Sequence, residues 1–119
     1  MRTILFKAKK LSDDKWVKGS LVKTPFGTFI EWYEDSVCNK EEVDASTVCQ
    51  FTGLTDKNGV EVYENDIVKV VRLKEKIYDV KYEDYRFKLC NKYFLDDVIP
   101  FFIVADTCAI NVVGNKFDN

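Results

Sequence analysis

The chain has 119 residues, of which 46% are hydrophobic and 14% aromatic, enough for a core of its own, which argues against disorder. No apolar stretch approaches the ~20 residues of a membrane-spanning helix, and the first residues do not form a signal-peptide hydrophobic region. We therefore expect a cytoplasmic protein, in the host cell cytosol, with no membrane partner. The chain has no histidine and its four cysteines form no C-x-x-C pair, so we expect no metal and no other cofactor.

The net charge of −2 is distributed unevenly. Residues 1–23 hold seven basic and two acidic residues, residues 31–66 hold two and ten, and residues 67–119 hold nine and eight. Neighbouring strands within one monomer could bring the opposite charges together. The alternative is a head-to-tail assembly in which the basic face of one subunit meets the acidic face of the next. We favour the first explanation, because charge blocks commonly arise without association.

Short apolar stretches separated by turn residues predict β-strands along most of the chain. The expected strands comprise residues 4–6, 16–23, 28–33, 67–73, 78–82, 85–90 and 109–114. Residues 25–27 join the second and third strands in a turn, since proline presets the φ angle of a turn and glycine closes it. Residues 34–39 are polar and are expected to form a loop. Residues 43–48 predict a short strand and at most one helical turn, capped by Asp44 or Ser46.

Residues 78–90 alternate between apolar and polar side chains on both arms of a further hairpin. A period of two predicts antiparallel strands with one buried face. The alternation places Tyr78, Tyr82 and Phe87 on the apolar face, where we expect them to be part of the core.

Residues 94–105 are ambiguous, because two aspartates could start a short helix while Pro100 would break it and the β-branched residues suit an extended segment. No helical pattern persists for three turns. The predicted fold is therefore mainly β, a small antiparallel barrel or curled sheets with hairpins and at most one or two short helical turns. No linker or repeat divides the chain, so residues 1–119 are expected to form a single domain.

Residues 51–70 contain the strongest hairpin signal in the chain. Asn58-Gly59 lies between alternating arms and predicts a type I′ turn, in which both central residues need positive φ. A second tight turn is expected at Glu64-Asn65-Asp66, where asparagine tolerates the left-handed region and the aspartate accepts backbone N–H groups. Asn58, Gly59, Asn65 and Asp66 are therefore interpreted as determinants of the fold and not as active-site residues.

The same stretch and other motifs resemble the YopX-like family of phage and prophage proteins. The similarity includes WVKGSL at 16–21, TVCQFTGL at 47–54 and VVGNKFDN at 112–119. Cys49 and Asn65 stand where the family pattern would have glycine; asparagine suits a left-handed position but cysteine does not, so Cys49 is expected to be extended. The resemblance implies an origin in a phage, prophage or similar mobile element, and it implies no known activity.

Catalytic chemistry is not indicated. The lack of histidine removes the commonest general base and the usual partner of a serine or cysteine nucleophile. Glu64 and Asp66 could share one face of a strand, but Asp66 begins a strand after a turn, where its carboxylate most simply accepts backbone N–H groups. The scattered glycines form no phosphate-binding or dinucleotide-binding pattern. We expect that the protein is not an enzyme.

Residues 67–93 hold eight basic and four acidic residues interleaved with aromatic ones. Small β domains bind single strands by stacking bases on exposed aromatic rings while cations follow the phosphates. Lys69, Lys81, Arg86 and Lys88 are the candidate contacts, and an outward basic stripe through them would favour nucleic-acid binding. The pI near 5.2 opposes non-specific phosphate binding, so nucleic acid is the alternative partner.

Phe101 and Phe102 follow Pro100 and are candidate contacts with a protein partner, unless they close one end of the core. An exposed apolar patch that included Phe26 or either of these residues would favour protein binding. The sequence as a whole is interpreted as a phage- or prophage-type accessory protein of unknown biochemical activity. Its expected role is that of a protein-interaction or self-assembly module, with an unknown protein or its own copies as partner.

Overall fold

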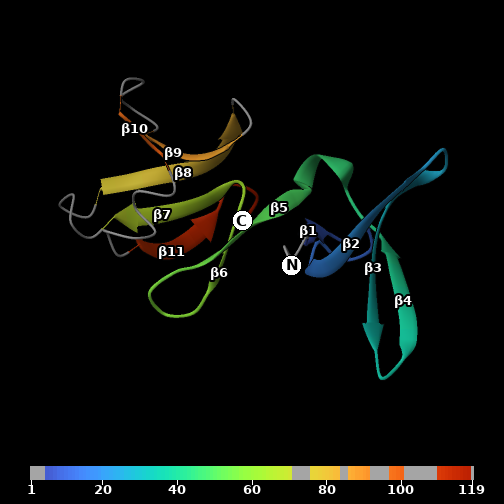
Figure 1. The fold of residues 1–119 in the computed structure, drawn as a ribbon. Coiled ribbons are helices and arrows are strands. Elements are labelled where there is room, and N and C mark those ends of the chain that lie inside the picture. The colour runs from blue at the N-terminus through green and yellow to red at the C-terminus, as the bar shows by residue number, and fades with distance from the viewer. Residues whose placement is uncertain (1–4, 71–75, 84–85, 92–96, 101–109, 119) are drawn as a thin grey trace. The chain divides into compact units, whose positions relative to one another are not determined.

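A computed structural model of the chain describes residues 5–70, 76–83, 86–91, 97–100 and 110–118. They form two compact units, an N-terminal unit of residues 1–51 and a C-terminal unit of residues 52–119 (Figure 1). The described elements are β1 Phe6–Lys9, β2 Trp16–Thr24, β3 Gly27–Glu34, β4 Val37–Glu42, the 3-10 helix η1 Ala45–Thr47, β5 Cys49–Thr55, β6 Glu61–Tyr63, β7 Asp66–Val70, β8 Lys76–Glu83, β9 Arg86–Asn91, β10 Val98–Pro100 and β11 Ile110–Asn115.

The expected mainly β fold is confirmed. The strands pair antiparallel in two sheets, and the described strands close neither sheet into a barrel. No helix among the described residues has the length and apolarity needed to cross a membrane. Two compact units can still fold as one cooperative domain, so the single domain over residues 1–119 stays a prediction.

The N-terminal unit contains the sheet order β4-β3-β2-β1, with the start of β5 beside β1. Apolar residues from one face of these strands pack together, and the fully or nearly fully buried ones are Ala8, Ile30 and Val43. Gly19 lies opposite Phe6, and a Cβ atom at this position would overlap the carbonyl oxygen of Glu31 on β3. Glycine at position 19 thus permits the close approach of β2 and β3.

The polar segment 34–39 is not a loop, contrary to the expectation. Glu34 pairs with Val37, and Asp35 and Ser36 between them have φ angles of 49° and 67°. Positive φ at both positions of a two-residue loop is the geometry of a type I′ hairpin. The prediction was wrong because β4 is an edge strand with exposed side chains, and its pairing with β3 leaves no alternating apolar pattern in the sequence.

The predicted single helical turn is present as η1. Asp44 caps it, because its carboxylate accepts a hydrogen bond from the Ser46 backbone N–H at 3.0 Å. The hydroxyl oxygen of Thr47 accepts a buried hydrogen bond from the Lys9 N–H at 2.9 Å, which fastens η1 to β1. Cys49 follows as the first residue of β5, and it is extended as expected.

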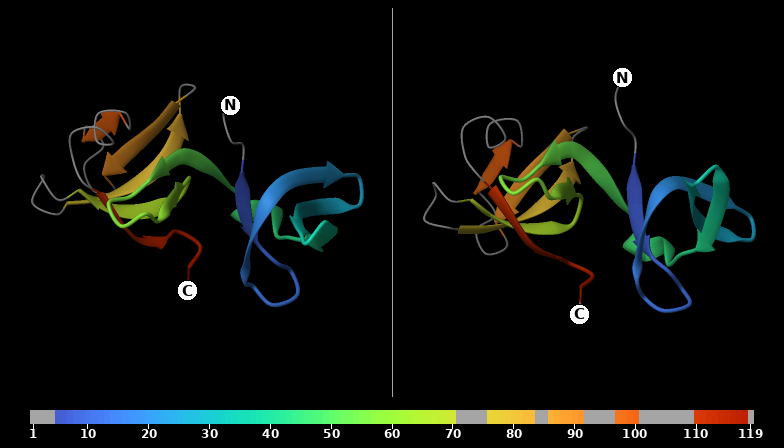
Figure 2. Two further views of the ribbon diagram at one scale, coloured as in Figure 1. Left: turned by 60° about the horizontal axis from the view of Figure 1, so that its bottom comes forward. Right: turned by 90° about the horizontal axis from the view of Figure 1, so that it is seen from below.

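The C-terminal unit contains the sheet order β10-β9-β8-β7-β11 (Figure 2). Its core is confirmed on the face predicted from the alternation in residues 78–90, and its buried members are Val62, Val68, Val70, Tyr78, Val80, Leu89 and Ile110. Phe87 packs against this core, and Tyr82 lies opposite Phe87 with the two rings 5.0 Å apart, although 46% of Tyr82 is exposed. Val98–Pro100 is extended, and the other residues of 94–105 lie outside the described part except Asp97.

The loop between β5 and β6 is not the type I′ turn that Asn58-Gly59 predicts. Gly59 has a φ of 82°, but Asn58 is not among the described residues with positive φ. The Gly59 N–H donates to the Asp56 carbonyl oxygen at 3.0 Å, and the Asp56 N–H donates to the Val60 carbonyl oxygen at 2.8 Å. This pattern is a type I turn followed by a glycine bulge.

The Asp56 carboxylate explains this outcome. It accepts hydrogen bonds from the backbone N–H groups of Asn58 at 2.8 Å and Val60 at 2.9 Å inside the loop, and from that of Val112 on β11 at 3.0 Å. Burial would raise the pKa of this carboxyl, but the three N–H donors together hold the pKa below its usual value. An aspartate that organises the loop from its first position therefore outweighs the turn preference of the Asn-Gly pair.

The second predicted turn has the expected backbone, with Asn65 at a φ of 70°. Asp66 is only 1% exposed, and its carboxylate accepts hydrogen bonds from the Tyr63 N–H at 2.7 Å and the Asn115 side-chain amide at 2.8 Å. Asp66 thereby joins the start of β7 to the end of β11. These contacts favour a structural use of this carboxylate over a catalytic one.

Candidate functional site

The four basic residues singled out in the sequence lie on one face of the C-terminal sheet. Cross-strand pairing places Lys81 opposite Lys88 and Arg86 opposite Glu83, and the strand alternation adds Lys69 on β7 to the same side. Arg86 and Lys81 are exposed, whereas Lys69 and Lys88 are half-buried. We call these four residues the basic face; it is the outer side of the sheet, opposite the core.

Two carboxylates reduce the positive charge of the basic face. Asp79 and Glu83 belong to the same side of β8, so the described part of this side of the sheet carries two anions beside the four cations of the basic face. The directly opposed Lys81 and Lys88 repel each other, which destabilises a strand pair by up to ~1 kcal/mol. Cys90 lies opposite Asp79, and burial followed by the charge of Glu83 raises the pKa of its thiol, so it is a poor nucleophile.

The basic face has no stacking platform among its described residues. Tyr78, Tyr82 and Phe87 all belong to the opposite side of the sheet, as the alternation predicted. The face could therefore contact a phosphate backbone, but its described part does not offer aromatic rings to bases.

The β3–β4 hairpin of the N-terminal unit carries exposed apolar side chains. Tyr33 is 70% exposed and Val37 60% exposed, and Cys38 is exposed directly opposite Tyr33. Val37 lies opposite Glu34, so Tyr33 and Val37 project from different faces of the hairpin. We call Tyr33, Val37 and Cys38 the hairpin end. Sequence reasoning missed it because residues 34–39 were interpreted as a loop.

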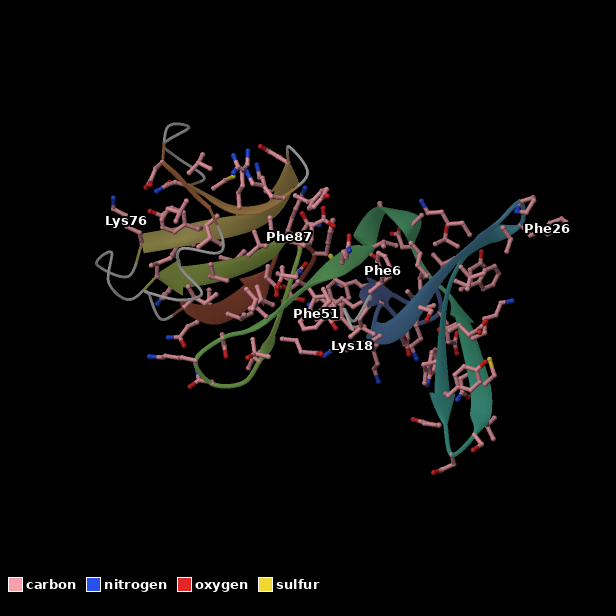
Figure 3. All side chains as sticks on the ribbon, in the orientation of Figure 1. Phe6, Lys18, Phe26, Phe51, Lys76 and Phe87 are labelled. Atoms are coloured by element: carbon pink, nitrogen blue, oxygen red, sulfur yellow. The ribbon has the colours of Figure 1, made fainter. Side chains whose placement is uncertain are left out.

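Phe26 lies at the other end of β3, in the turn that follows β2, and is 90% exposed (Figure 3). It is thus exposed as protein binding would require. It does not form a continuous patch with the hairpin end, because β3 separates the two. Phe101 and Phe102 lie outside the described residues.

The basic block of residues 1–23 is partly engaged within its own unit. The ammonium groups of Lys7 and Lys9 lie 4.6 Å and 5.6 Å from the centroid of the Trp16 ring, and Lys10 forms an ion pair with Asp13 at 3.2 Å. A cation over an indole face is a stabilising arrangement. The head-to-tail assembly that the charge blocks suggest stays a prediction.

The described residues contain no group of three or more histidine, cysteine, aspartate or glutamate side chains able to hold a metal ion. Cys38 and Cys90 are free thiols, the Cys49 thiol donates to the Thr47 carbonyl oxygen at 3.2 Å, and Cys108 lies outside the described part.

A family model described as YopX protein matches residues 5–119, which is nearly the whole chain. The chain belongs to the YopX family. A comparison with curated proteins found no match. Among solved structures, the chain is similar to "Crystal structure of protein EF1440 from Enterococcus faecalis", with a TM-score of 0.59 and 21% sequence identity over 97% of this chain and 94% of that one. At this identity the likeness shows a shared fold and nothing about activity.

Proposed function

We propose that this YopX family member is a phage- or prophage-type accessory protein that acts in the cytoplasm as a protein-interaction or self-assembly module and not as an enzyme. The observation that carries the proposal is the exposure of Tyr33 and Val37 on the β3–β4 hairpin. Tyrosine is enriched at protein interfaces, because it provides a large apolar area with a polar tip at a low entropic cost.

The backbone of the hairpin supports the same proposal. Asp35 and Ser36 both adopt positive φ, which costs roughly 1–2 kcal/mol at Ser36 and less at Asp35, because aspartate is among the residues that tolerate the left-handed region. Strained positions of this kind occur more often where a segment has a function. The hairpin thus presents apolar side chains from a defined, strained turn.

Affinity capture with the full chain tests this proposal. Proteins retained from a host lysate by the wild type should be lost with the double variant Tyr33→Ser/Val37→Ser. The matched control is Tyr82→Ser/Val113→Ser, which removes one exposed tyrosine and one exposed valine from the C-terminal unit. The same set of retained proteins with both double variants, together with a monomeric mass at all concentrations in light scattering, would contradict the proposal.

A second candidate function is nucleic-acid binding through the basic face. Its supporting observation is the outward stripe of Lys81, Arg86 and Lys88 on β8 and β9. Titration of labelled single- and double-stranded oligonucleotides at low and physiological salt tests it. Binding that weakens steeply with salt, with a slope reduced by roughly two in Lys81→Glu/Lys88→Glu, would support this function. Equal titration curves for wild type and variant would rule out the basic face.

A further inference from the structure

We propose that β4 is a docking edge for an extended segment of another protein, which is basic at one end and apolar at the other and adds to the N-terminal sheet as a further strand. The inference rests on the proposed protein-interaction function and specifies the chemistry of the partner. It stands on the backbone of β4, on the charges around it and on the other strand edges of the chain.

The backbone of β4 has an open side. The strand is the last in its sheet order, and among the described strands it pairs with β3 alone. The Val43 N–H donates to the Thr28 carbonyl oxygen at 2.9 Å, which sets the phase of the β3–β4 ladder. Because inward and outward peptide groups alternate along an antiparallel strand, those of Cys38 and Lys40 point away from β3.

The open side has a defined far end. The Glu42 carbonyl oxygen, which belongs to the same outward set, accepts a hydrogen bond from the Leu11 N–H at 3.1 Å. The stretch available to a partner strand is therefore the one that contains Cys38 and Lys40. A strand that pairs with this stretch would gain main-chain hydrogen bonds in the manner of β-strand addition.

The side chains of β4 specify the partner. Alternation places Cys38, Lys40 and Glu42 on one face of the strand and Val37, Asn39 and Glu41 on the other. On each face, a glutamate lies at the C-terminal end of β4, and an exposed small or apolar residue, Val37 or Cys38, lies at its N-terminal end. A complementary strand would carry lysine or arginine beside Glu41 and Glu42 and apolar residues beside Val37 and Cys38.

The surrounding charges disfavour an acidic partner. Glu31 on the neighbouring β3, and Glu34 and Asp35 at the turn beside Val37, add three negative charges, against which β4 contributes Lys40. Like charges directly opposed across two strands are unfavourable, so an acidic strand would be rejected.

The other edges of this chain do not fit that description. In the described part, the edge strands β6, β10 and β11 contain no lysine or arginine, as their sequences EVY, VIP and INVVGN show. The lysine-rich β1 pairs with β2 along its length and with β5 at Phe6 and Lys7, and β2 pairs with β1 over Trp16–Gly19 and with β3 over Ser20–Thr24. The edge strands β6, β10 and β11 therefore do not supply the complementary strand, and we place that strand in another protein.

The test uses the full chain and a labelled, acetylated eight-residue peptide with alternating valine and threonine in one half and lysine and threonine in the other. Fluorescence anisotropy should detect binding that weakens with salt, and a peptide with glutamate in place of lysine should not bind. In amide exchange measured by NMR, the N–H groups of Cys38 and Lys40 should become protected when the peptide binds. Protection elsewhere, or no binding, would overturn the inference.

Two substitutions at Lys40 distinguish the contribution of its backbone N–H to peptide binding from that of its side chain. Lys40→Pro removes an outward N–H and spares the ladder to β3, since proline is tolerated where the N–H of an edge strand faces solvent. We expect at least a tenfold loss of peptide affinity in Lys40→Pro and no loss in Lys40→Ala. If Lys40→Pro fails to fold, the amide exchange of the wild type shows whether the peptide pairs with the backbone of β4. Protection of Cys38 and Lys40 amides without peptide, in a sample that dimerises, would overturn the inference in favour of a second copy.

The outcome can be separated from that of the proposed function. If Tyr33→Ser/Val37→Ser loses its captured proteins while Lys40→Pro retains them, the interaction module stands and the docking edge is wrong. If all variants and the wild type capture the same proteins, the proposed function fails first.

Discussion

The two hairpin loops that follow β3 and β5 both begin near an aspartate, but the two aspartates have different structural roles. Asp35 lies inside a two-residue loop and itself adopts positive φ, together with Ser36. Asp56 lies at the start of a longer loop, and its buried carboxylate accepts three backbone hydrogen bonds. The first loop thus carries backbone strain at an exposed tip, whereas the second is stabilised by a side chain that also fastens β11.

Two loops with similar turn residues thus have opposite energetic roles in this chain. The hydrogen bonds to the Asp56 carboxylate stabilise its loop and connect it to β11 of the C-terminal sheet. Around Asp35 the structure tolerates an unfavourable conformation, and the loop ends a hairpin with exposed apolar residues. Loss of the Asp56 carboxylate should therefore lower stability, whereas substitutions that relieve the strain at Asp35 and Ser36 should raise it.

The largest effect is expected for Asp56→Ala. It removes the acceptor of three backbone N–H groups, one of them on β11, and should lower the free energy of unfolding by about 3 kcal/mol, as charged hydrogen bonds of this kind do when lost together. Urea unfolding measures the change. Asp35→Ala is the matched control and should change stability by less than ~1 kcal/mol; equal losses would refute the contrast.

Gly59→Val should have the next largest effect on the free energy of unfolding. A Cβ atom here would meet no neighbour within 4 Å, so the cost comes from a β-branched residue at a φ of 82° and is roughly 2 kcal/mol. Asn58→Ala tests the turn type, because in a type I′ turn substitutions at both Asn58 and Gly59 would lower stability. We expect a small effect at Asn58, which loses a hydrogen bond to Asn111. An unchanged melting temperature in Gly59→Val would contradict the assignment.

Asp35→Asn/Ser36→Gly should stabilise the protein, in contrast to both changes above. Asparagine and glycine reach positive φ at lower cost, so the free energy of unfolding should rise by about 1 kcal/mol. Thermal unfolding followed by circular dichroism measures the change. A lower melting temperature would show that the wild-type side chains of the turn stabilise it through contacts that outweigh the strain.

The smallest expected effect is a pH dependence. The folded-state pKa of Asp56 lies below its unfolded value, so its stabilising contribution is complete above the unfolded pKa of ~3.9 and is lost as the pH falls through the folded pKa. Urea titrations between pH 7 and pH 2 should show a steeper acid-side loss in wild type than in Asp56→Ala. Parallel curves would mean that Asp56 is not stabilised as a carboxylate.

Local chemistry made some elements predictable. Tyr78 and Phe87 were placed on the core side by alternation alone, and Asn65 was given its left-handed backbone from its side chain and its position in a turn. The four cations of the basic face were likewise found, because alternation assigns a face to every residue of a strand pair. The role of Asn65 and its neighbours as determinants of the fold stays a prediction until it is measured.

Other features depended on partners far along the chain. The strand at Val37–Glu42 has no apolar alternation and exists because β3 supplies its hydrogen bonds. The loop at Asp56 differs from its Asn-Gly signal because a carboxylate is held between the loop and Val112, which is 56 residues away.

The sequence by itself determined the mainly β class, the YopX family resemblance and which faces of the later strands are apolar, because these follow from local preference and period. Only the tertiary structure decided where the edges lie, which turn carries the strain and which apolar side chains remain exposed on the β3–β4 hairpin. Edge position, strain and exposure are properties of pairing between distant segments, and the local pattern of residues does not encode them.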